Sequence, residues 1–119
     1  MDIQKIQADL AQFAAERDWD KFHSPKNLTM ALAGEAGELV ALFQWMSEDE
    51  SANIPANSHK HARIREEMAD VFIYLAQLAY VLDVDIEQTV NDKIADNVKR
   101  YPIELSKGNA LKYTERNDI

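Results

Sequence analysis

The chain has 119 residues and a formal net charge of −8, with 21 acidic against 13 basic side chains. That length predicts one domain with a small core. The acidic balance argues against duplex nucleic acid as a partner, because phosphate backbones are bound through dense lysine and arginine patches. The absence of cysteine excludes disulfides and thiolate chemistry and fits a cytoplasmic location. We expect neither a signal peptide nor a membrane span, since no apolar run approaches the ~18 residues that a span needs.

The apolar residues recur with a helical period throughout, and no stretch alternates as a strand would, which predicts an all-α fold. The first predicted helix runs from about Asp2 to Arg17, and Asp2 is its candidate N-cap. The second helix has Ser24 as its N-cap and Pro25 as its first residue, and it ends near Trp45.

The residue pattern in the second half of the chain predicts two further helices. Residues 47–58 are polar and are predicted to form a loop. A third helix follows and ends at about Leu82. A fourth runs from about Asp85, its candidate cap, to Arg100, and the chain from Ile103 onward is predicted to be irregular.

Two acidic pairs of the same form occur on the second and third predicted helices. Glu35 and Glu38 make one pair, and Glu67 and Asp70 make the other, each with the i, i+3 spacing that places both carboxylates on one helix face. Such pairs are usually ordinary surface charges. Glu35 fits that interpretation badly, because it lies near the centre of an apolar stripe and no lysine or arginine lies within a turn of it. We expect Glu35 and Glu67 in the stripes and Glu38 and Asp70 on their rims.

A buried carboxylate is costly unless it is paired or bound to a metal. Four carboxylates without cysteine or a nearby histidine select a hard cation, which predicts Mg²⁺, with Mn²⁺ as a substitute. A di-iron site would need Glu-x-x-His motifs, and neither pair has one. Gly34 and Gly37 each cost a helix interior up to ~1 kcal/mol relative to alanine. They indicate a close approach, either by another helix or by a metal and its substrate.

Aromatic residues accompany the acids. Trp19, Phe22 and His23 precede the second helix, Trp45 ends it, and Tyr74 follows the second acidic pair by one turn. Singly, such residues are most often core residues, but beside a metal site a group of them could stack on a flat base.

Basic and amide side chains lie near the end of the fourth predicted helix, at Lys93, Asn97 and Arg100. The helix macrodipole alone favours basic residues at that place. The alternative is that these side chains hold the phosphate oxygens of a substrate.

The spacing of the two acidic pairs resembles that of the MazG-like all-α nucleoside triphosphate pyrophosphohydrolases. Further segments look like the dCTP pyrophosphatase branch of that family, namely residues 15–23, 25–28, 34–39, 42–45, 70–75, 99–102 and 112–115. The resemblance therefore covers nearly the whole chain. One departure is Leu10, where some relatives place a polar residue that contacts the base.

The resemblance implies a single domain over residues 1–119, with an irregular tail at about 103–119. It implies a bundle of four to five helices that assembles as intertwined dimers or a dimer of dimers, with sites shared between chains. The implied reaction is Mg²⁺-dependent hydrolysis of a nucleoside triphosphate, dCTP or a modified pyrimidine, to the monophosphate and pyrophosphate. Its implied role is house-cleaning of the nucleotide pool.

By motif match, the four acids would be the catalytic metal ligands, and the five aromatic residues named above would form the nucleobase pocket. Lys93, Asn97 and Arg100 would contact the phosphates. The alternatives are a non-catalytic helical interaction or regulatory module, and a pyrophosphohydrolase of the dUTP or phosphoribosyl-ATP type. The segment from Trp19 to His23 favours the dCTP-like branch over both of these enzymes.

Overall fold

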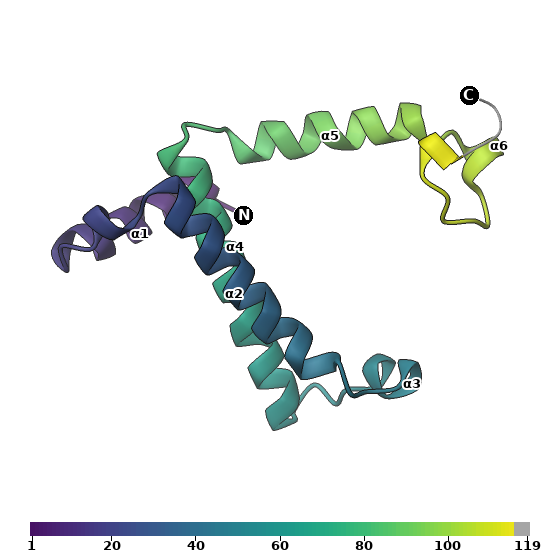
Figure 1. Ribbon diagram of the computed structural model, residues 1–119, viewed down its shortest axis with the longest axis horizontal. Helices are drawn as coiled ribbons and strands as arrows, with labels where there is room; N and C mark the ends of the chain where they lie inside the picture. The colour runs from purple at the N-terminus through teal and green to yellow at the C-terminus, as the bar shows by residue number, and fades with distance from the viewer. Residues whose placement is uncertain (116–119) are drawn as a thin grey trace. The chain divides into compact units, whose positions relative to one another are not determined.

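The computed structural model describes residues 1–115, and every regular element in that range is helical (Figure 1). The described range contains six α-helices and two 3₁₀ helices. The chain divides into two compact units, Met1–Val84 and a second unit that begins at Asp85. The predicted all-α class is confirmed. None of the described helices combines the length and the apolar character that crossing a membrane requires.

Three helices form the body of the first unit: α1 (Ile3–Glu16), α2 (Pro25–Phe43) and α4 (His59–Val81). Helix α2 runs alongside α4, and α1 packs against α4 near its C-terminal end (Figure 1). The Nζ atom of Lys60, in the first turn of α4, donates to the carbonyl of Leu42 at the end of α2 at 3.4 Å, so the two helices are antiparallel. The Nε2 atom of Gln7 donates to the carbonyl of Ala76 at 2.9 Å and ties α1 to α4.

The hydrophobic core of this unit is small. Its buried apolar residues, among those described, are Ala14, Leu28, Ile64, Ala76 and Ala79. Larger apolar side chains remain outside it, including Met30 on α2 and Met68 on α4, which are 62% and 58% exposed. Since burial of such a side chain is worth about 1.5–3 kcal/mol, the faces of α2 and α4 retain a strong tendency to pack against something further.

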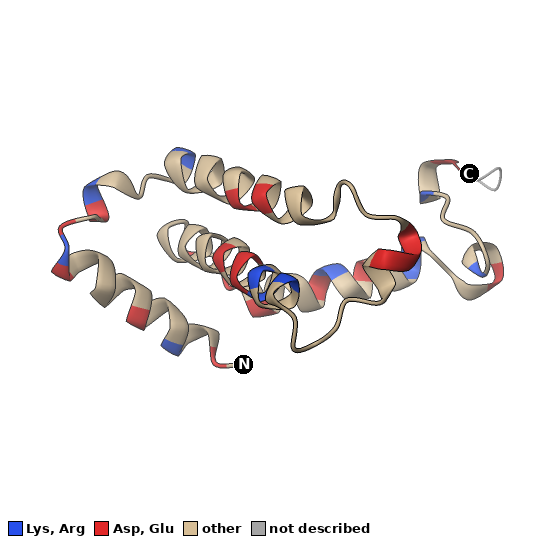
Figure 2. Cartoon of the chain, turned by 90° about the horizontal axis from the view of Figure 1, so that it is seen from below, with Lys and Arg blue, Asp and Glu red and all other residues tan. Residues whose placement is uncertain are grey.

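The prediction that residues 47–58 form a loop is wrong in part. This segment contains the short acidic helix α3 (Glu48–Ala52), drawn largely in red in Figure 2. A capping box begins this helix. The Ser47 hydroxyl accepts from the backbone N–H of Glu50 at 3.1 Å, and the Ser47 N–H donates to the Glu50 carboxylate at 3.3 Å. The Ser-x-x-Glu pattern that specifies this box was present in the sequence.

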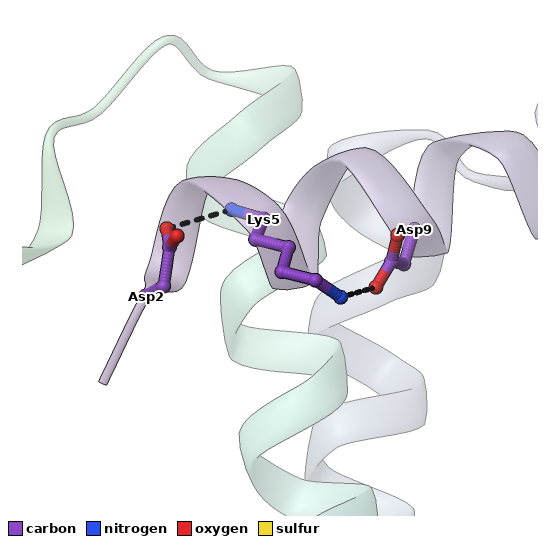
Figure 3. A network of polar contacts seen from close by, with 3 residues as sticks. All are labelled: Asp2, Lys5 and Asp9. Atoms are coloured by element: carbon purple, nitrogen blue, oxygen red, sulfur yellow. Dashed lines mark hydrogen bonds and ion pairs between the residues drawn. The ribbon is translucent and has the colours of Figure 1, made fainter.

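The predicted N-caps are confirmed. At the start of α1 the Asp2 carboxylate accepts from the backbone N–H of Lys5 at 3.0 Å, and the Lys5 ammonium also pairs with Asp9 at 2.8 Å (Figure 3). The Ser24 hydroxyl accepts from Asn27 N–H at 3.1 Å and caps α2. Each such bond satisfies one of the donors that the first helical turn leaves without a partner.

The second unit begins with α5 (Ile86–Arg100), which Asp85 caps by accepting from the Gln88 N–H at 3.0 Å. Both ends of this helix agree with the prediction. Beyond it, the tail predicted to be irregular contains the four-residue helix α6 (Ile103–Ser106) and the 3₁₀ turn η2 (Tyr113–Glu115).

Candidate metal centre

Three carboxylates converge where α2 and α4 lie side by side. Glu35 and Glu38 come from the middle of α2, and Glu67 comes from α4. One oxygen from each lies within 4.8 Å of the others. Asp70, one helical turn after Glu67, lies close enough for its charge to act on Glu35. The antiparallel helix pair therefore brings together acids that the sequence places on two separate segments. We name Glu35, Glu38, Glu67 and Asp70 the carboxylate cluster.

The inner members of the carboxylate cluster lack partners. Glu67 is only 6% exposed, and the Oε2 atoms of both Glu67 and Glu35 are buried with no hydrogen-bond partner among the described residues. Glu38 is exposed and Asp70 is half-buried. Within residues 1–115 no lysine, arginine or histidine forms an ion pair with any of the four acids. Buried carboxylates in this condition require either a cation or a proton.

The carboxylates act on one another's protonation. The pKa of Glu35 is raised from its ordinary 4.5 to about 7, first because its carboxyl can share a hydrogen bond with Glu67 and then because of burial. A hydrogen bond with Glu38 and the negative charges of Glu38 and Asp70 raise the pKa further. Without a cation, the carboxylate cluster therefore holds a proton near neutral pH.

The donor set fits a hard divalent cation. All the candidate ligand atoms are carboxylate oxygens, which Mg²⁺ and Mn²⁺ prefer over softer metals. The oxygens of Glu35, Glu38 and Glu67 are close enough to share one ion after small side-chain movements. A cation here would supply the missing partners for the buried Oε2 atoms and would displace the proton from Glu35.

Four of the five predicted base-binding aromatics lie in two groups on this chain. Trp19 and His23 flank the 3₁₀ turn η1 (Asp20–Phe22), which ends with Phe22, just before α2. Trp45 follows the end of α2 and is 89% exposed. The 19 residues of α2 rise by 1.5 Å each, so its two ends are about 27 Å apart. One chain does not bring the two groups together.

A cavity of about 50 Å³ lies between α1, η1 and the C-terminal half of α4. Leu10, Ala14 and Tyr80 contribute apolar walls, while Asp20 and His23 contribute polar groups. Of the predicted base-binding residues, only His23 lines this cavity. The sequence did not single out Asp20, although that residue directly follows Trp19 in the chain.

Tyr74 and the predicted phosphate contacts do not line this cavity. Tyr74 is half-buried on α4, one turn beyond Asp70. In the second unit, Lys93 and Arg100 both pair with Asp96, at 3.7 and 3.1 Å, and Asn97 is exposed on the same helix. The Arg100 guanidinium also lies over the Tyr113 ring, 4.8 Å from its centre.

The sequence profile of the MazG-like family matches residues 31–115, a range that includes all four acids. The chain belongs to the MazG-like family. This MazG-like chain is 47% identical over 114 residues to dCTP pyrophosphatase 1 of Mus musculus, and 44% identical over 114 residues to that of Homo sapiens. In both comparisons 96% of this chain aligns with 65% of the relative, so the MazG-like chain spans about two thirds of their length.

A solved structure shares the fold of this MazG-like chain. The crystal structure of a pyrophosphatase from Archaeoglobus fulgidus superimposes with a TM-score of 0.78 at 34% sequence identity. The match covers 86% of this chain and 94% of the archaeal chain. The resemblance to the MazG-like family and its dCTP pyrophosphatase branch is confirmed.

Proposed function

We propose that this chain hydrolyses a pyrimidine deoxynucleoside triphosphate, dCTP or a modified form of it, to the monophosphate and pyrophosphate with bound Mg²⁺. The observation that carries the proposal is the carboxylate cluster, in which two carboxylates from facing helices each have a buried oxygen without a hydrogen-bond partner among the described residues. The relatives named dCTP pyrophosphatase 1 and the archaeal pyrophosphatase support the same activity.

Glu35, Glu38, Glu67 and Asp70 would hold the cation, with Mn²⁺ as a competent substitute. When bound, the cation supplies positive charge against the triphosphate and lowers the pKa of a water molecule. Glu67 is the most buried of the four and anchors the site, while the exposed Glu38 faces incoming substrate.

The reaction forms a bond from the water oxygen to the α-phosphorus and breaks the bond from that phosphorus to the pyrophosphate oxygen. Pyrophosphate leaves, and the proton of the attacking water passes to a carboxylate. We assign this proton to Glu35, because its carboxylate lies within the carboxylate cluster and has a buried Oε2 atom without a hydrogen-bond partner among the described residues. The monophosphate and pyrophosphate are the only products.

The nucleobase would be held by Trp19, Phe22, His23, Trp45 and Tyr74, and the phosphates by Lys93, Asn97 and Arg100. Since the two ends of α2 are about 27 Å apart, one small substrate cannot touch both Trp19 and Trp45 of a single chain. We therefore propose a homo-oligomer, a dimer or a dimer of dimers, whose sites take residues from two chains.

Two further observations support assembly. A Cβ atom added at Gly34 or Gly37 would meet nothing within 4 Å, so the close approach predicted for these glycines is not made within the described chain. Met30 and Met68 also lie exposed on the same helix pair. A second copy packed on these faces would account for both features. We further propose that the protein acts in the cytoplasm in house-cleaning of the nucleotide pool.

A panel of nucleoside triphosphates, assayed with Mg²⁺ for monophosphate and pyrophosphate, tests the proposal. We expect dCTP or a modified pyrimidine to give both products, and Glu38→Gln and Asp70→Asn to abolish turnover while the helices stay folded. Glu66→Gln is the matched control, because Glu66 lies beside Glu67 but is exposed and approaches Arg63 at 4.0 Å. A non-catalytic module would give no product with any nucleotide, and release of orthophosphate would also contradict the proposal.

A further inference from the structure

The backbone of Trp19 is fixed to the end of α1. The Trp19 N–H donates to the carbonyl of Ala14 at 2.9 Å, and the Asp18 N–H donates to that of Ala15 at 3.1 Å. Asp18 has a φ of 55°, so it occupies the left-handed position of a Schellman motif. On the other side, the Trp19 carbonyl accepts from the Phe22 N–H at 2.9 Å. Both peptide groups of Trp19 are therefore held, and only its side-chain torsions remain to be set.

The ring of Trp19 contacts that of Phe13, which lies in the last turn of α1. The two ring centres are 5.7 Å apart with an interplanar angle of 71°, an edge-to-face geometry. The guanidinium of Arg17 lies over the Phe13 ring, 3.6 Å from its centre, and its Nη1 donates to the Phe13 carbonyl at 3.1 Å. Arg17 therefore holds Phe13, and Phe13 in turn limits the rotamers of Trp19.

The Trp19 and Phe13 rings hold these positions at the protein surface. Trp19 is 45% exposed and Phe13 is 46% exposed, so neither ring owes its position to burial in the core. About half of the indole remains open to a flat ligand. A ring that is oriented before binding loses less side-chain entropy on binding than one that rotates freely.

We propose that Phe13 and Arg17 are positioning residues, which orient the Trp19 indole for stacking on the substrate base. The inference rests on the proposed function, because it takes Trp19 as a contact of the base. Removal of the Phe13 ring should weaken nucleotide binding by about threefold to tenfold, the loss that corresponds to ordering one freed side chain. Binding of inorganic tripolyphosphate, which has no base, should not change.

Binding is measured in the unsubstituted full chain, because Trp45 is itself a proposed contact of the base. Fluorescence is measured in a parent that carries Trp45→Phe, which leaves Trp19 as the single tryptophan. In this parent, Phe13→Leu should increase the fast component of the Trp19 fluorescence anisotropy decay without nucleotide. In the chain that retains Trp45, Phe13→Leu should weaken binding of a non-hydrolysable dCTP analogue by the stated factor and leave tripolyphosphate affinity and the melting temperature nearly unchanged. Phe13→Tyr keeps the ring and should restore both properties, and Arg17→Met should show a smaller loss of the same kind.

The outcomes separate the positioning role from a general structural one. An equal loss of tripolyphosphate affinity, or no rescue by Phe13→Tyr, would overturn the positioning role. If Phe13→Leu left both the nucleotide affinity and the anisotropy decay unchanged, the positioning role would also be overturned. If the unsubstituted chain bound no nucleotide at all, the proposed function itself would be overturned.

Discussion

Cation binding at the carboxylate cluster should release protons in an amount that depends on pH, because ligand carboxyls bind metals only when deprotonated. Glu35 carries the proton, since its pKa is raised to about 7 by the hydrogen bond with Glu67, by burial and by Glu38 and Asp70. A group with that pKa is about half protonated at pH 7 and about one-tenth protonated at pH 8. Binding of the cation should therefore displace about half a proton at pH 7 and almost none above pH 8.

Calorimetric titration with MgCl₂, in two buffers of different ionisation enthalpy, measures this number directly. Glu35→Gln has no carboxyl to titrate and should lose the pH-dependent release. Glu66→Gln, the matched exposed neighbour, should keep it. A parent protein that releases no proton at pH 7, or a release profile that Glu35→Gln retains, would refute the assignment of the proton to Glu35.

The same pKa determines how the stability of the cation-free protein changes with pH. The folded pKa of about 7 lies above the ordinary 4.5, so the folded state binds this proton more tightly than the unfolded state. The contribution of Glu35 to stability is therefore complete below about pH 4.5 and is lost as the pH rises through about 7. The urea midpoint of the cation-free protein should fall between pH 5 and pH 8, and Glu35→Gln should reduce that fall. A fall of equal size in the variant would contradict this account.

Three further predictions concern the fold and its assembly. Leu28 is 1% exposed, so Leu28→Ala should lower the free energy of unfolding by about 2–5 kcal/mol in urea titrations, and a loss under ~0.5 kcal/mol would contradict its place in the core. Asp2→Ala removes the α1 cap and should cost about 0.5–2 kcal/mol, whereas Asp9→Ala breaks only an exposed ion pair and should cost much less; equal losses would contradict the role of the cap. Gly37→Met should dissociate the proposed oligomer in sedimentation experiments while the circular dichroism stays helical, and an unchanged oligomer would place the interface elsewhere.

The local features of this fold could be predicted from the sequence. The caps at Asp2, Ser24 and Asp85 depend only on a side chain and an N–H three residues later, so the sequence determines them. The acidic pairs were predictable for the same reason, since a helix places residues i and i+3 on one face. The helix α3 was missed although its capping box was present, because its short polar sequence lacks an apolar stripe.

The arrangement of the site depended on packing that the sequence does not express. The meeting of Glu35 with Glu67 requires the antiparallel register of α2 and α4. Asp20 faces a cavity only because α1 packs on the end of α4. The separation of Trp19 from Trp45, by contrast, follows from the length of α2, which the sequence did predict.

Hydrolysis of dCTP in water enriched in ¹⁸O tests the central claim most directly. We predict that the label enters the monophosphate and not the pyrophosphate, because the water attacks the α-phosphorus. We also predict that both products are lost when Mg²⁺ is removed by a chelator or when Glu67→Gln replaces the buried carboxylate. Label in the pyrophosphate, release of orthophosphate, or undiminished turnover in the presence of the chelator would contradict the account.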